Sequence, residues 1–272
     1  MSFTIKPPEQ IIQETNKIAL IDADYIKYIV TYWLFKNHMF NKEEPTPENL
    51  LIEEIDQFVH NILLGIECKS KIFIFSGKTR DGFRWSIARD KPYKGNRKSK
   101  ELLYPNQMND MNFVFDYIQS KEHTLRYEDL EADDLLAMLQ SEDTFIYSKD
   151  KDMLQIPGTH FDIKTDEFHV VSEDQGWRFL MAQVLTGDST DNILGLRNFG
   201  PAKVKALFIG VATHELYEVV LRTFIEHLGM RHGVDAFVEN YSLVRLTLNR
   251  GDWNREKYKD AYNLINTLKL IK

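Results

Sequence analysis

The sequence predicts an α/β protein with a central, mostly parallel sheet, followed by a region of helices. Before Gly176, short apolar runs typical of buried strands alternate with longer stretches of helical periodicity. This alternation favours parallel strands joined by helices. After Gly176 the strand patterns stop, and glycines punctuate a chain with helical spacing. We therefore expect an α/β domain over residues 1–182 and a helical domain over residues 183–272.

The predicted elements follow one another in a regular order. Residues 17–23 read as a buried strand and residues 25–36 as the helix after it. Residues 48–66 carry apolar side chains at helical spacing, and residues 71–75 form the second strand. The later predictions are helices at 111–120 and 131–140, strands at 124–128 and 144–148, and an antiparallel pair at 161–164 and 168–171.

Length and composition exclude several classes of protein. The chain has 272 residues, of which 43% are hydrophobic and 28% charged, so it can bury a core. No apolar run approaches the roughly 18–20 residues that cross a bilayer, and the first ten residues lack the apolar part of a signal peptide. A single cysteine, Cys68, excludes an internal disulfide and a cysteine-rich zinc site. We expect a monomer without a membrane partner in a reducing cytoplasm.

Charge is unevenly distributed along the chain. The net charge is −7, yet residues 78–100 carry nine cations and two acids. A local basic patch can bind a polyanion whatever the sum over the whole chain. Aromatic side chains interleaved with the cations, such as Phe83, Tyr93 and Tyr104, are suited to stacking on bases. Solvated surface is the alternative interpretation of the charge, and packing against the domain is the alternative for Trp85.

Acidic residues form four clusters, three of which follow predicted strands. Ligands of open α/β sheets bind beyond the carboxyl ends of the strands. Carboxylates gathered there repel one another, and Mg²⁺ is the hard cation that compensates such oxygens. Two such ions about 4 Å apart support phosphodiester cleavage. Each cluster alone also fits helix caps or turns. The clusters are Asp22 and Asp24; Glu131, Asp133 and Asp134; Asp150 and Asp152; and Asp188 and Asp191.

Five motifs together resemble the 5′-nuclease family of flap endonucleases and 5′→3′ exonucleases, above all the small phage enzymes. They are LIDADY (20–25), FRWSIARDKPYKGNRK (83–98), YEDLEADD (127–134), YSKDKD (147–152) and LTGDSTDNILGLRNFGPAKVKAL (185–207). The resemblance covers roughly residues 17–210, in the family's order and spacing. It implies a PIN-like core, a helical arch at about 78–105, and a helix–three-turn–helix DNA-binding motif at about 186–210.

The resemblance also implies roles for individual residues. In the arch, Lys94 would contact the scissile phosphate, Tyr93 would stack on a substrate base, and Arg97 and Arg84 would contact phosphates. Eight acids would hold divalent metal directly or through water: Asp22, Glu131, Asp133, Asp134, Asp150, Asp152, Asp188 and Asp191. Further DNA contacts would come from Lys91, Lys98, Lys100, Gly195, Gly200, Lys203 and Lys205.

One family position is different in this chain. The family usually has a further metal-binding aspartate just after the second strand, where this sequence reads Ser76, Gly77 and Lys78. The nearest acid is Asp81. Either Asp81 reaches the metal from a longer loop, or the first metal has one ligand fewer.

The function implied by the resemblance is a 5′-nuclease that uses Mg²⁺, with Mn²⁺ as a substitute and two ions at the site. K⁺ would bind at the helix–three-turn–helix hairpin. The substrate would be duplex DNA with a 5′ end or flap, and RNA in RNA–DNA hybrids would be a second one. The role would lie in replication or DNA degradation, in the host cytoplasm if a phage encodes the chain.

Two alternatives to this function remain. A PIN-type ribonuclease shares the acidic site but would not need the arch or the GDSTDN region. A structure-specific DNA-binding protein with a decayed metal site is supported only by the missing aspartate.

Overall fold

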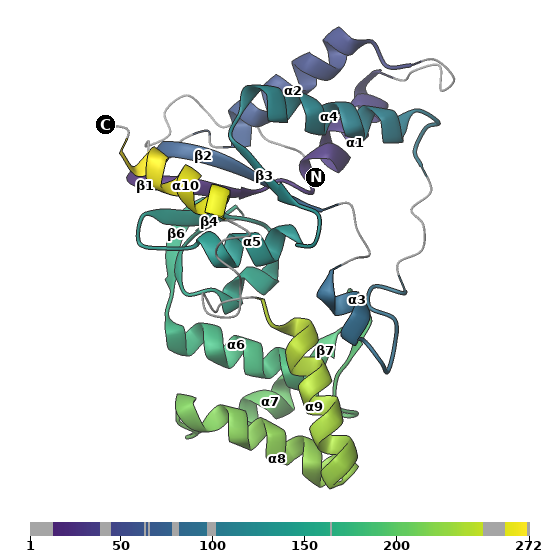
Figure 1. Cartoon of the computed structure of the whole chain (residues 1–272), viewed down its shortest axis with the longest axis vertical. Helices are drawn as coiled ribbons and strands as arrows, with labels where there is room; N and C mark the ends of the chain where they lie inside the picture. The colour runs from purple at the N-terminus through teal and green to yellow at the C-terminus, as the bar shows by residue number, and fades with distance from the viewer. Residues whose placement is uncertain are drawn as a thin grey trace.

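A six-stranded sheet lies at the centre of the upper part of the molecule, and a group of helices packs below it (Figure 1). The computed structural model describes residues 13–38, 45–62, 64, 66–77, 82–96, 102–163, 165–246 and 259–270. The strand order is β3-β2-β1-β4-β5-β6, and only the β5–β6 pair is antiparallel. The α/β fold class with a mostly parallel sheet is therefore confirmed.

The strands occupy the segments expected from the apolar runs, with ends that differ by a few residues. They are β1 (Gln13–Asp22), β2 (Ile66–Ser76), β3 (Thr124–Tyr127), β4 (Thr144–Tyr147), β5 (Gly158–Asp162) and β6 (Glu167–Val171). The helices of this part are α1 (Ile26–His38), α2 (Glu48–Ile62), α3 (Phe83–Ile87), α4 (Gln107–Lys121) and α5 (Ala132–Leu139). The sequence patterns did not predict α3.

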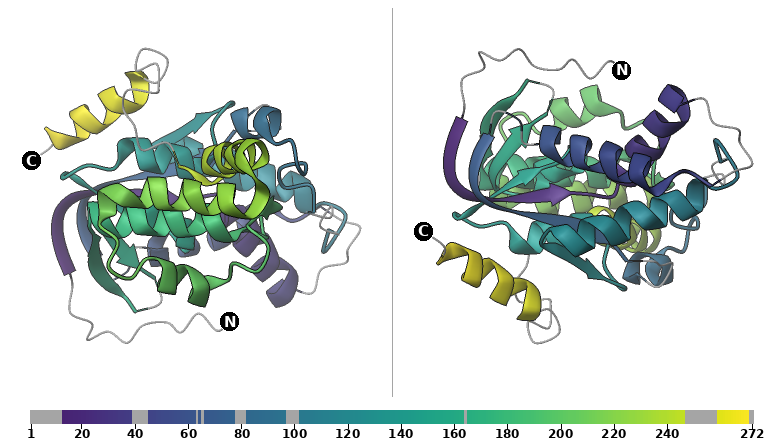
Figure 2. Two further views of the ribbon diagram at one scale, coloured as in Figure 1. Left: turned by 90° about the horizontal axis from the view of Figure 1, so that it is seen from below. Right: turned by 90° about the horizontal axis from the view of Figure 1, so that it is seen from above.

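Both faces of the sheet are covered by helices, as Figure 2 shows from above and below. In β1, Ile18 and Leu20 belong to a buried cluster that includes α5 and α10 (Lys259–Lys269). Ala19 and Ile21 belong to a second cluster with α1, α2 and α4. Because neighbouring residues of a strand point to opposite faces, a strand buried on both sides needs a continuous apolar run. This explains the unbroken run that ends at Asp22.

The helical region begins with α6 (Glu173–Thr186), which starts at Ser172 through a capping box. It continues through a two-residue hairpin, α7, a short 3₁₀ turn, α8 and α9. Their bounds are β7 (Gly187–Asp188), β8 (Ile193–Leu194), α7 (Pro201–Leu207), η2 (Thr213–Glu215), α8 (Leu216–Leu228) and α9 (Met230–Val244). These helices share a third buried cluster.

Two helices join the parts of the chain that were expected to form separate domains. Helix α6 runs through the expected boundary between residues 182 and 183. Helix α10, at the end of the chain, packs against α5 and β1, because Ala261, Ile265 and Leu268 bury their apolar stripe in a cluster of the sheet. Among the described residues, no helix combines the length and apolar character needed to span a membrane.

Candidate active site

The carboxyl ends of the parallel strands meet at one edge of the sheet, and Asp22 lies there at the end of β1. The strands on its two sides, β2 and β4, come from different parts of the chain, so Asp22 marks the switch point of the sheet. Ser148 Oγ donates a hydrogen bond to Asp22 at 2.8 Å. The Ser76 backbone N–H donates to Asp24 at 3.0 Å. Two acids after β1 are thus tied to the ends of both neighbouring strands.

Three acids from three strand ends influence one another at this edge. Burial, together with the charge of Asp24, raises the pKa of Asp22 to about 7. Burial also raises the pKa of Asp133 well above its usual value, and the charges of Asp22 and Asp150 add to this. The structure therefore brings the expected acids after β1, β3 and β4 into one electrostatic environment, in which neighbouring carboxylates oppose the ionisation of Asp22 and Asp133.

A second acidic pair, Asp152 and Asp188, lies beside this group. Asp152 is in the 3₁₀ turn η1 (Lys151–Gln155), and burial followed by the charge of Asp150 raises its pKa to about 6. Lys151 Nζ lies 3.1 Å from Asp188 Oδ2 and 3.8 Å from Asp152 Oδ1. Burial alone would raise the pKa of Asp188, but the hydrogen bonds from Lys151 and the Thr190 N–H outweigh it and lower that pKa.

Lys94 lies beside two of these acids. Its Nζ forms an ion pair with Glu131 and lies 3.9 Å from Asp191 Oδ2. The Tyr93 hydroxyl lies 2.8 Å from a carboxylate oxygen of each of the same two acids. The Lys94 side chain is 16% exposed, so most of it is buried beside these groups. Two lysines, Lys94 and Lys151, therefore supply the positive charge that the acidic cluster requires.

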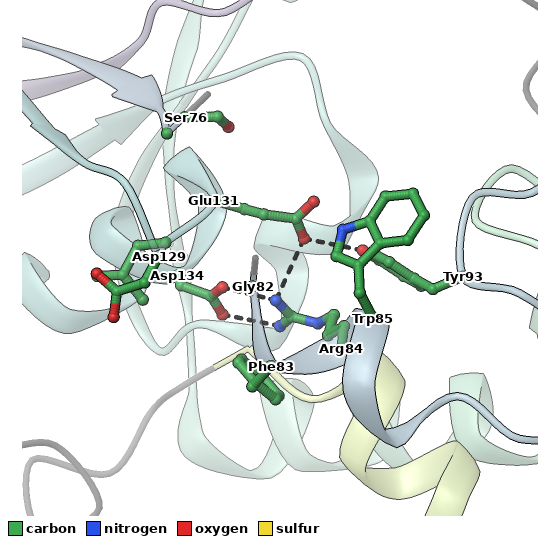
Figure 3. Close-up of a pocket in the computed structure, with 11 residues that line it drawn as sticks. Ser76, Gly82, Phe83, Arg84, Trp85, Tyr93, Asp129, Glu131 and Asp134 are labelled. Atoms are coloured by element: carbon green, nitrogen blue, oxygen red, sulfur yellow. Dashed lines mark hydrogen bonds and ion pairs between the residues drawn. The ribbon is translucent and has the colours of Figure 1, made fainter. Parts of the chain in front are cut away.

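Tyr93 and Arg84 have surroundings that differ from the expected DNA contacts. Tyr93 is 3% exposed and its ring meets Trp85 edge to face at 5.5 Å, so it has no open face on which a base could stack. Arg84 is also 3% exposed and forms a bidentate ion pair with Asp134, at 2.6 and 2.8 Å (Figure 3). Asp134 in turn is directed at Arg84, which differs from the metal-binding role expected for it. Trp85 packs against Tyr93 within the basic segment, in line with the packing role that was considered for it.

A pocket of about 60 Å³ lies beside these side chains (Figure 3). Arg84, Tyr93, Glu131 and Asp134 are among the residues that line it. Ligand pockets usually measure about 300–1,000 Å³. This pocket is therefore too small to hold a nucleotide.

The basic segment rests on the acidic loop that joins β7 to β8. The Lys94 N–H donates to the Asp191 carbonyl at 2.8 Å. The Asn96 side chain donates to the Ser189 carbonyl at 2.6 Å, and the Asn192 side chain donates to the Pro92 carbonyl at 2.9 Å. These contacts place Lys94 against Asp191. The two asparagines are the sequence features that could have indicated these contacts, but the sequence patterns assigned no such role to them.

Parts of the expected arch lie outside the described residues. These are Asp81, Arg97, Lys98 and Lys100. The described part has one five-residue helix, α3, and its residues from 88 to 96 form turns and bends. Lys91 is exposed there. The arch expected from the resemblance is helical only at α3 within the residues described.

The missing aspartate after β2 has a packing explanation. A Cβ atom at Gly77 would lie 2.4 Å from the carbonyl oxygens of both Tyr127 and Glu128. The Gly77 N–H donates to the Leu130 carbonyl at 2.9 Å, and Ser76 Oγ accepts from the Ala132 N–H at 2.9 Å. The chain therefore crosses the loop between β3 and α5 too closely for a larger residue at position 77.

The donor set fits a hard divalent cation in its chemistry. The converging side chains are carboxylates, the ligands that Mg²⁺ prefers, and their mutual repulsion would be relieved by a cation. In the part of the chain that the structure describes, no three acidic, histidine or cysteine side chains are already grouped as metal ligands. Lys94 pairs with Glu131 and Lys151 with Asp188, so the positive charge beside these acids comes from lysine side chains in the metal-free structure.

The expected helix–three-turn–helix motif at about 186–210 includes helix α7 and the turn before it. Helix α7 begins at Pro201 after Gly200, and Asn198 in the preceding turn has a φ of 64°. Lys203 and Lys205 are exposed. Gly195 has a packing role, since a Cβ atom there would lie 2.2 Å from the Thr186 carbonyl group.

The raised pKa of Asp22 predicts a pH-dependent stability of the metal-free protein. Between about pH 4 and pH 7, folded Asp22 keeps a proton that the unfolded chain has lost, so its contribution to the free energy of unfolding falls as the pH rises. An Asp22→Asn variant lacks this pH-dependent contribution to the free energy of unfolding. In EDTA we expect the melting temperature of the variant to rise relative to that of the wild type as the pH goes from 5 to 8. A melting-temperature difference that does not change with pH would contradict this.

Comparisons with known proteins agree with this fold. The family model described as 5′-3′ exonuclease, N-terminal resolvase-like domain, matches residues 17–183. No curated protein sequence matches the chain at a significant level.

Three solved structures show the fold over nearly the whole chain. A bacteriophage T5 protein co-crystallised with metal ions has a TM-score of 0.65 and 15% identity, over 93% of this chain and 100% of that one. The T5 flap endonuclease, in a pseudo-enzyme–product complex with DNA and metal ions, has a TM-score of 0.62 and 14% identity, over 94% and 98%. The T5 5′-exonuclease with bound zinc has a TM-score of 0.61 and 15% identity, over 94% and 98%.

Proposed function

The chain belongs to the 5′-3′ exonuclease family defined by its N-terminal resolvase-like domain, and we propose that it is a divalent-metal-dependent nuclease that cuts DNA at or near a 5′ end or flap. The single observation that carries this proposal is the placement of Lys94 between Glu131, which precedes α5, and Asp191, in the loop between β7 and β8. This arrangement offers carboxylates for cations and an ammonium group for a phosphate at one edge of the sheet.

The acids divide into two groups that would hold metal. Asp22, Asp133 and Asp150 form the first group, and Asp152 and Asp188 form the second. Mg²⁺ or Mn²⁺ bound there would supply an activated water and neutralise charge on the phosphate oxygens. Glu131 and Asp191 contact Lys94 and Tyr93, so they would orient these two residues and would hold the metals through water.

Lys94 and Lys151 would act as internal cations until substrate and metal bind. Each holds together carboxylates that would otherwise repel one another. With bound metal compensating the acids, the ammonium group of Lys94 would be available to a substrate phosphate. It would then stabilise the negative charge that develops during cleavage.

Duplex DNA would bind at the exposed lysines of α7 and at the turn directly before that helix. This assignment, and a K⁺ ion at the hairpin, rest on the family resemblance. The related T5 flap endonuclease was solved with DNA and metal ions, which supports a DNA substrate and a divalent ion for this chain.

The experiment that tests the function compares metals on one DNA substrate. Wild-type protein is mixed with a 5′-flap duplex in Mg²⁺, Mn²⁺ or Ca²⁺, and binding and cleavage are followed on native and denaturing gels. We expect binding in all three and cutting in Mg²⁺ and Mn²⁺. Binding without cutting in any metal would indicate a decayed site and would contradict the proposal. Cutting of single-stranded RNA alone would favour the PIN-type ribonuclease, and an RNA–DNA hybrid tests the second substrate.

A further inference from the structure

Arg84 joins three distant parts of the chain through one buried guanidinium group. It lies in α3, at the base of the basic segment, and its ion-pair partner Asp134 lies in α5. Its Nε donates to the Leu243 carbonyl at 2.8 Å, and its Nη2 donates to the Arg245 carbonyl at 2.8 Å. These two carbonyl groups lie at the C-terminal end of α9. Arg84 therefore ties the basic segment and the helical region to the helix that carries the acids.

The remaining N–H of Arg84 is directed at Glu131. Nη1 lies 3.2 Å from Glu131 Oε2, in addition to its contact with Asp134 (Figure 3). A guanidinium group has five N–H donors, and all five now have acceptors: one at Nε, two at Nη1 and two at Nη2. Arg84 thus has no donor to spare for a phosphate.

We propose that Arg84 is a positioning residue that sets the orientation of the Glu131 carboxylate, with Asp134 as its buried counter-ion. The proposal deepens the nuclease function proposed above and rests on it. Glu131 receives Arg84 and Tyr93 on one oxygen and Lys94 on the other. Its carboxylate is therefore held on both sides. Through the Glu131 carboxylate, the packing of α3 against α9 is coupled to the acid cluster.

A lysine at position 84 is the informative substitution. It keeps the positive charge but has three donors on one nitrogen, and it cannot span Asp134, Glu131 and the α9 carbonyl groups together. A charge-assisted hydrogen bond contributes enough to change an equilibrium constant roughly ten- to a hundredfold. We expect Arg84→Lys to weaken Mn²⁺ binding by at least roughly tenfold, measured by calorimetry without DNA.

Glu239 supplies a matched control, because it holds the same segment in another way. Its Oε1 accepts from the N–H groups of Arg89 and Asp90, at 2.6 and 2.9 Å. Glu239→Ala therefore loosens the segment after α3 without removing a donor from Glu131. We expect this variant to bind Mn²⁺ within about threefold of wild type.

A double-mutant cycle separates positioning from a purely structural role. If Arg84 acts through Glu131, Arg84→Lys should add no further loss of Mn²⁺ affinity once Glu131→Gln is present. Losses that multiply in the double variant, or normal Mn²⁺ binding by Arg84→Lys, would overturn the proposal. If Arg84→Lys does not fold, Asp134→Asn takes its place in the double-mutant cycle, because it removes the counter-ion of the Arg84 guanidinium group.

A measurement made without metal distinguishes a failure of this inference from a failure of the proposed function. In a crystal structure of the Arg84→Lys variant, we expect the Glu131 side chain to have left its wild-type position. An unchanged Glu131 would overturn the inference alone. A wild-type protein that neither binds Mn²⁺ nor cleaves DNA would instead contradict the proposed function.

Discussion

Replacing Asp152 or Asp188 with asparagine is expected to abolish DNA cleavage and leave DNA binding largely intact. Both acids belong to the group paired by Lys151, where a divalent ion would bind. Each substitution would remove a charged oxygen ligand of the proposed ion but keep nearly the same shape. A catalytic metal contributes several kcal/mol to transition-state stabilisation, so cleavage should fall by at least about a thousandfold. Single-turnover cleavage and a gel-shift titration in Ca²⁺ measure the two properties.

A matched control for these variants is Asp116→Asn. Asp116 is exposed on α4, which covers the sheet on the face opposite α5. This variant should cleave at the wild-type rate, because its change of charge lies away from the acid cluster. Near-normal turnover in both Asp152→Asn and Asp188→Asn would contradict the metal assignment.

Replacing Lys94 with alanine is expected to lower turnover by roughly two to three powers of ten. Lys94 is held among Glu131 and Asp191, and its ammonium group is positioned where a phosphate would approach the acids. A well-placed charged contact to the reacting group contributes about 3–4 kcal/mol, which corresponds to this loss of rate. Rates measured with enzyme in excess over a 5′-flap duplex report this step directly.

The control for Lys94→Ala is Lys121→Ala, which removes the same charge from an exposed position at the end of α4. It should leave turnover unchanged. A loss below about tenfold, or about 1.4 kcal/mol, in Lys94→Ala would assign Lys94 a peripheral role.

The strand ends and their acids could be predicted from the sequence because their signals are local. An apolar run followed by an acid, as in the residues leading to Asp22, indicates both a buried strand and its carboxyl end. Parallel strands place such ends at one edge of the sheet. The electrostatic coupling of Asp22, Asp133 and Asp150 follows from this topology.

The roles of Arg84, Tyr93 and Asp134 could not be predicted in the same way. The Arg84 partners Leu243 and Arg245 lie about 160 residues away along the chain. Only the packing of α9 against α3 reveals that the guanidinium group is buried. A charged side chain in a basic segment suggests exposure, and this expectation fails where an acid and backbone carbonyl groups enclose it.

Short elements were also missed for physical reasons. Helix α3 has five residues and the β7–β8 hairpin pairs only two residues on each side, so neither is long enough to show a repeating hydrophobic pattern. Both hold site residues: α3 carries Arg84 and β7 carries Asp188. The elements least visible in the sequence are therefore among those that build the site.

Cleavage of a labelled 5′-flap duplex tests the central claim most directly. The flap strand is labelled, the protein is added in Mg²⁺ or in EDTA, and the products are sized on a denaturing gel. The account predicts products only with Mg²⁺, either a single cut near the junction or a ladder of short fragments from the 5′ end. A native-gel shift of the duplex with no product in Mg²⁺ or Mn²⁺ would contradict it.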